Sequence, residues 1–178
     1  ATAIKYGTDA LGGVIVVNPP ELPDKAGLGG SISLMGQSNG RSGTLSGFLE
    51  GGIKNHDGWG WRVQGTTKQS GDYRAPNYFL TNTGGRELNF SAAAGLHRQN
   101  YGFEVFASRF HTTLGILKST SISNIQDLLV AMSNEEPLYT SGFSYSISQP
   151  HQEVSHNLIK LNAHKKSAGG EWRLQYGL

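Results

Sequence analysis

One short motif in the sequence is typical of a catalytic nucleophile. Residues Gly36-Gln37-Ser38-Asn39-Gly40 match G-x-S-x-G, in which a serine stands on a sharp turn between a strand and a helix. The residues that follow, from Arg41 to Leu45, continue instead as a strand. Asn39-Gly40 is moreover a pair typical of hairpin turns. The motif therefore predicts a turn and no nucleophile.

Histidines and carboxylates form no recognisable metal or acid–base site. The chain has six histidines and no cysteine, which removes thiolate zinc sites and cysteine nucleophiles. His156 and His164 share one face of a predicted strand, but about 26 Å of strand separates them, so they cannot share an ion. Glu135 and Glu136 are adjacent in a loop, and the other acids are scattered. We predict no enzymatic activity, no metal site and no cofactor.

One predicted loop combines aromatic, cationic and amide side chains, and we select it as the candidate ligand-binding site. The candidate residues are Tyr73, Arg74, Asn77, Tyr78, Asn82 and Arg86. Aromatic and cationic residues on a loop suit a binding surface for a small ligand. A solvated loop beside polar strand faces would have the same composition, so both interpretations fit. The net charge of +2 gives no reason to expect a nucleic-acid partner.

Long alternating segments position this loop. From position 58 to 68, for example, Trp59, Trp61 and Val63 alternate with Arg62 and Gln64, which indicates a strand with one apolar and one polar face. Similar patterns predict seven strands, at residues 28–37, 42–53, 58–69, 86–97, 101–111, 152–166 and 171–178. Most of these are longer than the usual five or six residues, and strands that cross an outer membrane need about nine to eleven.

The predicted connections are short at one end of the sheet and long at the other. In an up-and-down meander, alternate connections lie at the same end. The second, fourth and sixth are short and the third and fifth are long, so only the first breaks the rule. Aromatic residues of the apolar faces lie beside the short turns: Trp59, Trp61, Tyr101, Phe103 and Trp172. Both features are typical of outer-membrane barrels, which have long extracellular loops and aromatic girdles.

Composition excludes a membrane-spanning helix, and one local pattern predicts a short loop helix. The 178 residues include 25 glycines, roughly twice the usual share, and no run approaches the roughly 18 apolar residues that a spanning helix needs. In the loop from Thr112 to His151, Ser123-Asn124-Ile125-Gln126 fits a capping box, and Leu128 and Met132 follow at helical spacing. We therefore predict an all-β antiparallel meander with one short loop helix.

The opening segment follows a different pattern. Residues 6–17 form a turn followed by a continuous apolar strand, and a linker from Glu21 to Gly27 comes after Asn18-Pro19-Pro20. This segment resembles the end of the plug domain of TonB-dependent outer-membrane receptors, where Tyr-Gly-x-x-Ala-x-Gly-Gly-Val-Ile forms the last plug strand before the first barrel strand. The matching residues of this plug-end motif are Tyr6, Gly7, Ala10, Gly12, Gly13, Val14 and Ile15.

The resemblance implies a domain organisation. Residues 1–20 would be the C-terminal end of a plug domain, and residues 21–178 the N-terminal portion of a transmembrane β-barrel of 22 strands. Seven strands are odd in number and too few to close a barrel, so we expect a fragment of a longer receptor. The expected structure is an open meander with two unpaired edges.

The resemblance also implies a function. Receptors of this family carry out energised uptake of a scarce ligand, of the siderophore, cobalamin or glycan class, in the outer membrane of a Gram-negative bacterium. The expected partners are outer-membrane lipid, the remainder of the receptor chain, and the TonB complex through an N-terminal region that this sequence lacks. Two alternatives remain: a soluble all-β ligand- or carbohydrate-binding module, and a small outer-membrane barrel of the adhesin or enzyme type.

Overall fold

The computed structural model describes residues 20–120, 124–137 and 139–178. They form mainly long β-strands, with one short α-helix and two single 3-10 turns. The elements are β1 (Gly27–Gln37), η2 (Asn39–Arg41), β2 (Ser42–Gly52), β3 (Trp59–Ser70), β4 (Tyr73–Arg74), β5 (Phe79–Leu80), β6 (Gly85–His97), β7 (Tyr101–Gly115), η3 (Lys118–Thr120), α2 (Ile125–Ser133), β8 (His151–Ser167) and β9 (Gly170–Gly177). The seven predicted strands are confirmed, and the ribbon of β4 and β5 is an addition.

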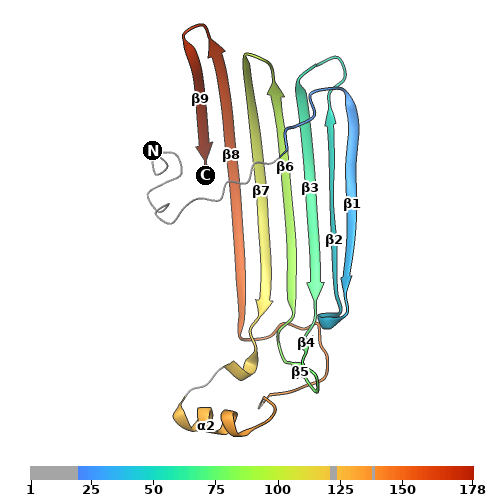
Figure 1. The fold of residues 1–178 in the computed structure, drawn as a ribbon, viewed down its shortest axis with the longest axis vertical. Helices are drawn as coiled ribbons and strands as arrows, with labels where there is room; N and C mark the ends of the chain where they lie inside the picture. Colours follow the sequence, from blue (N-terminus) through green and yellow to red (C-terminus); the bar gives the residue numbers. More distant parts are fainter. Residues whose placement is uncertain (1–19, 121–123, 138) are drawn as a thin grey trace.

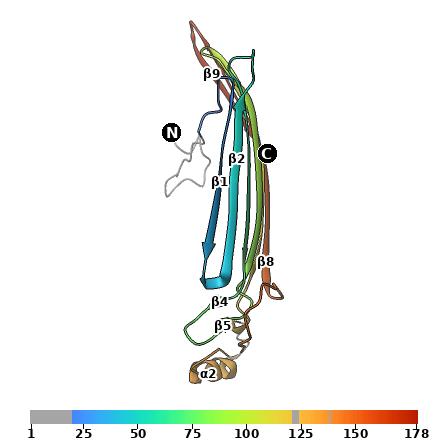
Figure 2. The same cartoon turned by 90° about the vertical axis from the view of Figure 1, so that its right-hand side faces the viewer.

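The seven long strands form one antiparallel sheet. Its order is β1-β2-β3-β6-β7-β8-β9, so each long strand pairs with its neighbours in the chain and the sheet is an up-and-down meander (Figure 1). Within the described residues, β1 and β9 each pair on one side only, and the sheet is not closed into a barrel. Figure 2 shows the sheet almost edge-on as a gently bent single layer. The predicted open meander with a short loop helix is confirmed.

No helix in the part of the chain that the structure describes is both long enough and apolar enough to cross a membrane.

The register aligns alternate residues of all strands on two faces. Trp61 pairs with Ala94, Ala94 with Val105, and Val105 with Leu161. The face that carries these residues is called the apolar face. It also carries Leu28, Ile32, Leu34, Leu45, Leu49, Trp59, Val63, Leu88, Phe90, Phe103, Ile159, Trp172, Leu174 and Tyr176. The opposite face, called the polar face, carries Ser31, Glu50, Arg62, Gln64, Lys68, Asn89, Glu104, Lys160, Asn162 and Arg173, with Phe48, Phe106 and Phe110 among them.

The apolar face is exposed rather than packed into a core. Ile32 and Leu34 are 83% and 81% exposed, and Leu22 is the one hydrophobic residue that is buried among the described residues. The chain exposes 12857 Å², whereas a compact monomer of 19.1 kDa exposes roughly 8,400 Å². The sheet therefore lacks the apolar packing that stabilises a compact soluble domain.

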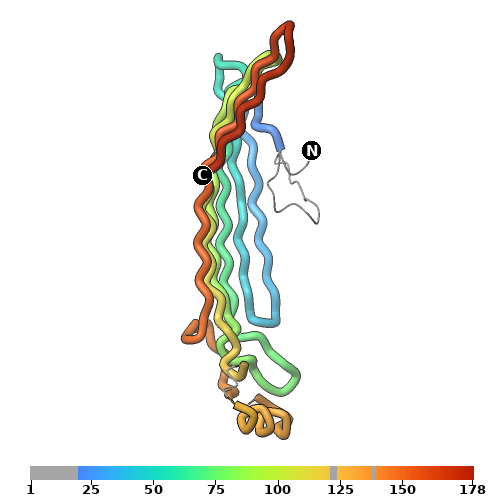
Figure 3. Tube along the Cα trace, turned by 90° about the vertical axis from the view of Figure 1, so that its left-hand side faces the viewer, coloured from blue at the N-terminus to red at the C-terminus, as the bar shows by residue number. Residues whose placement is uncertain are grey.

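The two ends of the sheet differ in their connections. Residues 53–58, 98–100 and 168–169 form short connections at what we call the turn end, and residues 38–41, 71–84 and 116–150 connect strands at the loop end (Figure 1). At the turn end, the rings of Trp59 and Phe103 meet edge to face with centroids 5.5 Å apart. Figures 2 and 3 show that the β4–β5 ribbon leans toward the side of the sheet along which residues 20–26 run.

The helix α2 begins one residue after the start that the capping box predicts. Asn124 is the N-cap in extended conformation, and its side-chain oxygen accepts a hydrogen bond of 2.8 Å from the Asp127 backbone N–H. The acceptor therefore lies three residues before the donor, which is the usual N-cap spacing. Ser123, the first residue of the predicted box, lies outside the described residues.

Candidate binding site at the loop end of the sheet

Three connections that are far apart in the sequence join at the loop end. The Gly71 amide donates to the Gly40 carbonyl at 2.8 Å, and the Asp72 amide donates to the Ser144 carbonyl at 2.9 Å. These bonds link the β1–β2 turn, the β3–β6 connection and the β7–β8 connection. The three segments therefore form one hydrogen-bonded unit beyond the strand ends, at the bottom of Figure 1.

The β1–β2 turn contains the residues of the G-x-S-x-G motif. Ser38 leads into a single 3-10 turn, and strand β2 follows directly, which confirms the predicted turn. Asn39 holds the β4–β5 ribbon to this turn with two hydrogen bonds. Its side-chain oxygen accepts from the Arg74 backbone N–H at 2.6 Å, and its amide nitrogen donates to the Arg74 carbonyl at 3.2 Å.

Cationic and aromatic side chains gather where the three connections meet. The Arg41 guanidinium carbon lies 4.1 Å from the ring centre of Phe143, and that of Arg74 lies 5.8 Å from the ring centre of Phe79. The two phenylalanine rings meet at 5.6 Å, and Phe143 meets Tyr145 at 4.9 Å. We call these five residues the loop cluster. It places two guanidinium groups on one aromatic assembly.

A hollow of about 450 Å³ opens beside the loop cluster. Its lining residues are Ser38, Asn39, Gly40, Arg41, Arg74, Ala75, Pro76, Phe79 and Phe143. Among the described residues, the guanidinium groups of Arg41 and Arg74 form neither an ion pair nor a hydrogen bond. The hollow therefore combines unpaired positive charge with apolar surface, a combination that suits an anion with an apolar body.

Asn82, one of the predicted ligand residues, braces the loops. It is only 3% exposed. Its amide nitrogen donates to the carbonyls of Ile116 and Pro150, at 2.8 and 2.7 Å, and its side-chain oxygen accepts from the Ser148 amide at 2.8 Å. Because these bonds occupy the side chain, the structure gives Asn82 a supporting position under the β7–β8 connection.

The other predicted residues are divided between the site and its surroundings. Arg74 belongs to the loop cluster, and the half-buried Tyr73 lies against Gly40 in the neighbouring turn. Asn77 is exposed in the bend of the ribbon, where the Ala75 amide donates to the Tyr78 carbonyl at 2.9 Å. Arg86 lies apart from the hollow. It is on strand β6, on the apolar face, where it pairs with Gln69 and Thr113.

Four cluster residues were not among the sequence candidates, and one of them, Phe79, stands in the same loop as the candidates. Arg41 directly follows a hairpin dipeptide, whereas Phe143 and Tyr145 stand in the predicted long loop. The Tyr145 hydroxyl donates to the Arg41 carbonyl at 2.8 Å across 104 positions of sequence. The aromatic pair in a polar loop is a signal that could have marked this segment, but its proximity to Arg41 is visible only in three dimensions.

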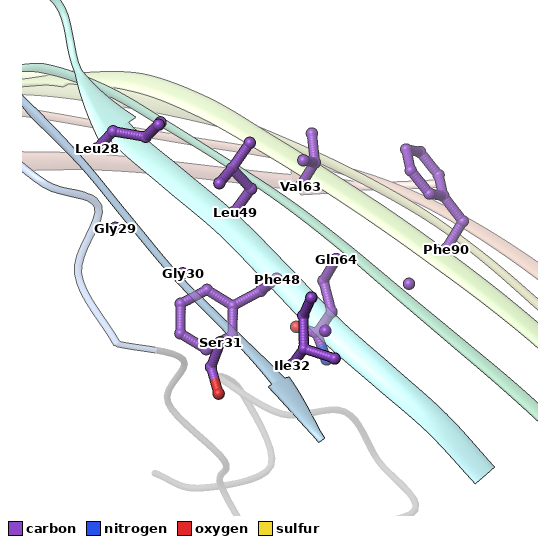
Figure 4. A pocket seen from close by; sticks show the side chains of 12 residues that line it. Leu28, Gly29, Gly30, Ser31, Ile32, Phe48, Leu49, Val63, Gln64 and Phe90 are labelled. Carbon is purple, nitrogen blue, oxygen red and sulfur yellow. The ribbon is translucent and has the colours of Figure 1, made fainter. Parts of the chain in front are cut away.

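A second hollow lies on the apolar face near the β1 edge. It has a volume of about 760 Å³ and extends over Gly30, Gly47 and Gly65, which have no side chains to fill it. In Figure 4, Leu28, Leu49, Val63 and Phe90 project from the same side of four neighbouring strands beside it. Leu28 is 73% exposed, so this hollow is an open apolar trough.

The linker before β1 crosses the polar face near the turn end. Arg62 donates to the carbonyls of Pro20 and Glu21, at 2.9 and 3.0 Å, and Leu22 is buried behind them. The Gly58 amide donates to the Asp24 carbonyl at 2.9 Å. These bonds place residues 20–24 on the polar face of the sheet.

The plug-end motif lies outside the residues that the structure describes. Its residues include Tyr6, Gly7, Ala10, Gly12 and Gly13. In the described ranges, no three histidine, aspartate or glutamate side chains gather as a metal site would require. No family model matches the chain, and no similar protein was found among the curated proteins or the solved structures.

Proposed function

We propose that this chain forms part of the barrel wall of a TonB-dependent outer-membrane receptor, which takes up a scarce ligand and catalyses no reaction. The observation that carries the proposal is the arrangement of the sheet. Long meandering strands expose one apolar face, and the opposite polar face binds the linker from the N-terminal segment. Lipid would cover the apolar face, and the polar face would line the lumen.

The length of the apolar band supports a membrane setting. On strand β6, the stretch from Leu88 to Leu96 that carries the apolar residues is nine residues long, within the roughly nine to eleven that a tilted strand needs to cross an outer membrane. Toward the loop end, Arg86 follows on the same face, and Arg109 follows Ala107 on strand β7. Arg86 thus stands just outside the band, whereas Arg109 pairs with Phe90 near the loop end of the band, where its long side chain would extend toward the outer headgroups.

Aromatic side chains support the same orientation. Trp59, Trp61, Phe103 and Trp172 lie on the apolar face at the turn end, where an interfacial girdle is expected. The long connections at the other end would then lie outside the cell. A ligand would meet the loop cluster before it reached the lumen.

The position of the linker supports the assignment of the plug. A plug domain has to enter the lumen of its barrel, and residues 20–24 lie on the polar face rather than on the apolar one. The linker thus lies on the side of the sheet where the lumen would be. The TonB complex would act through a region that precedes the linker, and the rest of the receptor chain would pair with the free edges of β1 and β9.

Cell fractionation tests this proposal against a soluble binding module. An antibody against residues 71–84 would follow the native protein in cells of its source. We expect the protein in the outer-membrane fraction, with faster gel migration in unheated samples, as a folded barrel shows. Recovery as a detergent-free monomer in the soluble fraction would contradict the proposal and favour the soluble module.

A further inference from the structure

We propose that the hollow beside the loop cluster binds a small organic oxyanion, a carboxylate or phosphate joined to an apolar body. The oxyanion would lie between the guanidinium groups of Arg41 and Arg74, and the apolar part would lie on Pro76 and Phe79. This inference rests on the proposed function in one respect only, namely that a ligand would reach the loop end from outside the cell. The site itself is built from contacts within the described residues.

The charge of the site selects an anion. Arg41 and Arg74 approach two phenylalanine rings that are in contact with each other, which holds both cations in one place. Neither guanidinium has a carboxylate partner among the described residues. The nearby Asp72 is 1% exposed, and its carboxylate accepts from the Thr83 amide at 3.0 Å. Guanidinium forks match the geometry of carboxylates and phosphates.

The site is organised before a ligand arrives. The Asn39 side chain hydrogen-bonds both the backbone N–H and the carbonyl of Arg74, and the Tyr145 hydroxyl donates to the carbonyl of Arg41. Phe143 occupies the space where a side chain at position 71 would be, so that Gly71 allows this ring to lie under Arg41. A preorganised site loses less conformational entropy on binding, which favours affinity for a small ligand.

The size and lining of the hollow select an organic rather than a simple inorganic anion. Its volume of about 450 Å³ lies within the roughly 300–1,000 Å³ range of small-molecule pockets. Ala75, Pro76 and Phe79 provide apolar surface beside the two cations. An aromatic or aliphatic body would bury this surface, whereas inorganic phosphate would use only the charges.

Calorimetric titration of the detergent-purified protein with two probes tests the proposal. Phenyl phosphate and phenylacetate share an aromatic body and differ in their oxyanion. We expect at least one of them to bind, more tightly than inorganic phosphate and than the uncharged benzyl alcohol. Arg41→Gln and Arg74→Gln should each weaken binding about tenfold, the size of one lost charge-assisted hydrogen bond.

Matched controls make the outcomes decisive. Arg98→Gln removes an exposed arginine at the turn end and should leave probe binding unchanged, while Arg41→Lys should restore only part of the affinity because it lacks the planar fork. Wild-type affinity in both glutamine variants, or no binding of either organic probe, would overturn the proposal. Probe binding to the purified protein does not depend on its location in the cell. The binding test can therefore fail while fractionation supports the receptor, and fractionation can fail while the probes bind.

Discussion

Arg62 donates to Glu50 across the β2–β3 pair at 2.6 Å and also binds the linker that leads to β1. Both side chains are largely shielded, at 17% and 24% exposure. One guanidinium thus joins two strands of the polar face to the segment that precedes the sheet. The position of the linker is therefore coupled to a single ion pair on the polar face.

Removing this guanidinium should release the linker. In Arg62→Met, the carbonyls of Pro20 and Glu21 lose their donor, and hydrogen bonds to charged groups contribute about 1.5–3 kcal/mol each. Hydrogen exchange of the Gly58 amide, which donates to the linker carbonyl of Asp24, should accelerate at least about tenfold. Arg173→Met, which breaks an exposed pair on β9, is the control. Unchanged exchange at Gly58 would show that Arg62 does not hold the linker.

A side chain at position 60 should displace the linker by sterics alone. Gly60 lies on β3 where a Cβ would collide with the Pro23 carbonyl, whereas a Cβ at Gly36 on β1 would meet open space. Limited trypsin digestion after the exposed Lys25 reports the change, and we expect faster cleavage in Gly60→Ala than in Gly36→Ala. Equal cleavage of both variants would mean that the linker does not lie against Gly60.

Loss of the Asn82 side chain should destabilise the loop end. Asn82→Gly accommodates the backbone φ of 64° but removes three part-buried hydrogen bonds, to the Ile116 and Pro150 carbonyls and from the Ser148 amide. We expect the free energy of unfolding to fall by about 2–4 kcal/mol, as measured in urea, because each of the three lost hydrogen bonds contributes about 0.5–1.5 kcal/mol. Asn77→Gly at the exposed bend should change it by less than about 0.5 kcal/mol. A similar effect of both substitutions would remove the special role of Asn82.

A charge in the middle of the apolar band should impair membrane assembly. Leu49 lies on the apolar face of β2. Gln64, which pairs with the preceding residue Phe48, lies on the polar face of β3. Lysine at a lipid-facing midplane position costs about 2–4 kcal/mol. We expect Leu49→Lys to reduce the folded fraction in lipid vesicles, while Gln64→Lys folds as the unchanged protein does. If water covers the apolar face, the 44% exposed Leu49 should accept lysine without loss.

The sheet was predictable from the sequence because its signals are local. Alternation fixes which residues share a face, and turn dipeptides such as Asn39-Gly40 fix where a strand ends. The predicted bounds of β2 and β6 differ from the structure by one residue at one end. Strand β7 runs to Gly115, four residues past the prediction, because residues 112–115 pair with β8 although Thr112 and Thr113 lack a clear apolar alternation.

The binding site was predictable only in part because its contacts are not local. Arg74 and the aromatic character of its loop were visible in the sequence. The proximity of Arg41 to Phe143, however, results from three connections that meet above the sheet. Asn82 has the composition of a ligand residue, and its bonds to Ile116 and Pro150 became visible only with the fold.

Labelling of single cysteines in intact cells tests the central claim most directly. The chain has no cysteine of its own, so Asn77→Cys at the loop end and Ala168→Cys at the turn end each introduce one exposed thiol. We predict that a membrane-impermeant maleimide labels Asn77→Cys in intact cells and Ala168→Cys only after the outer membrane is permeabilised. Equal labelling of the two variants in intact cells would contradict the proposal that this sheet spans an outer membrane with its long loops outside.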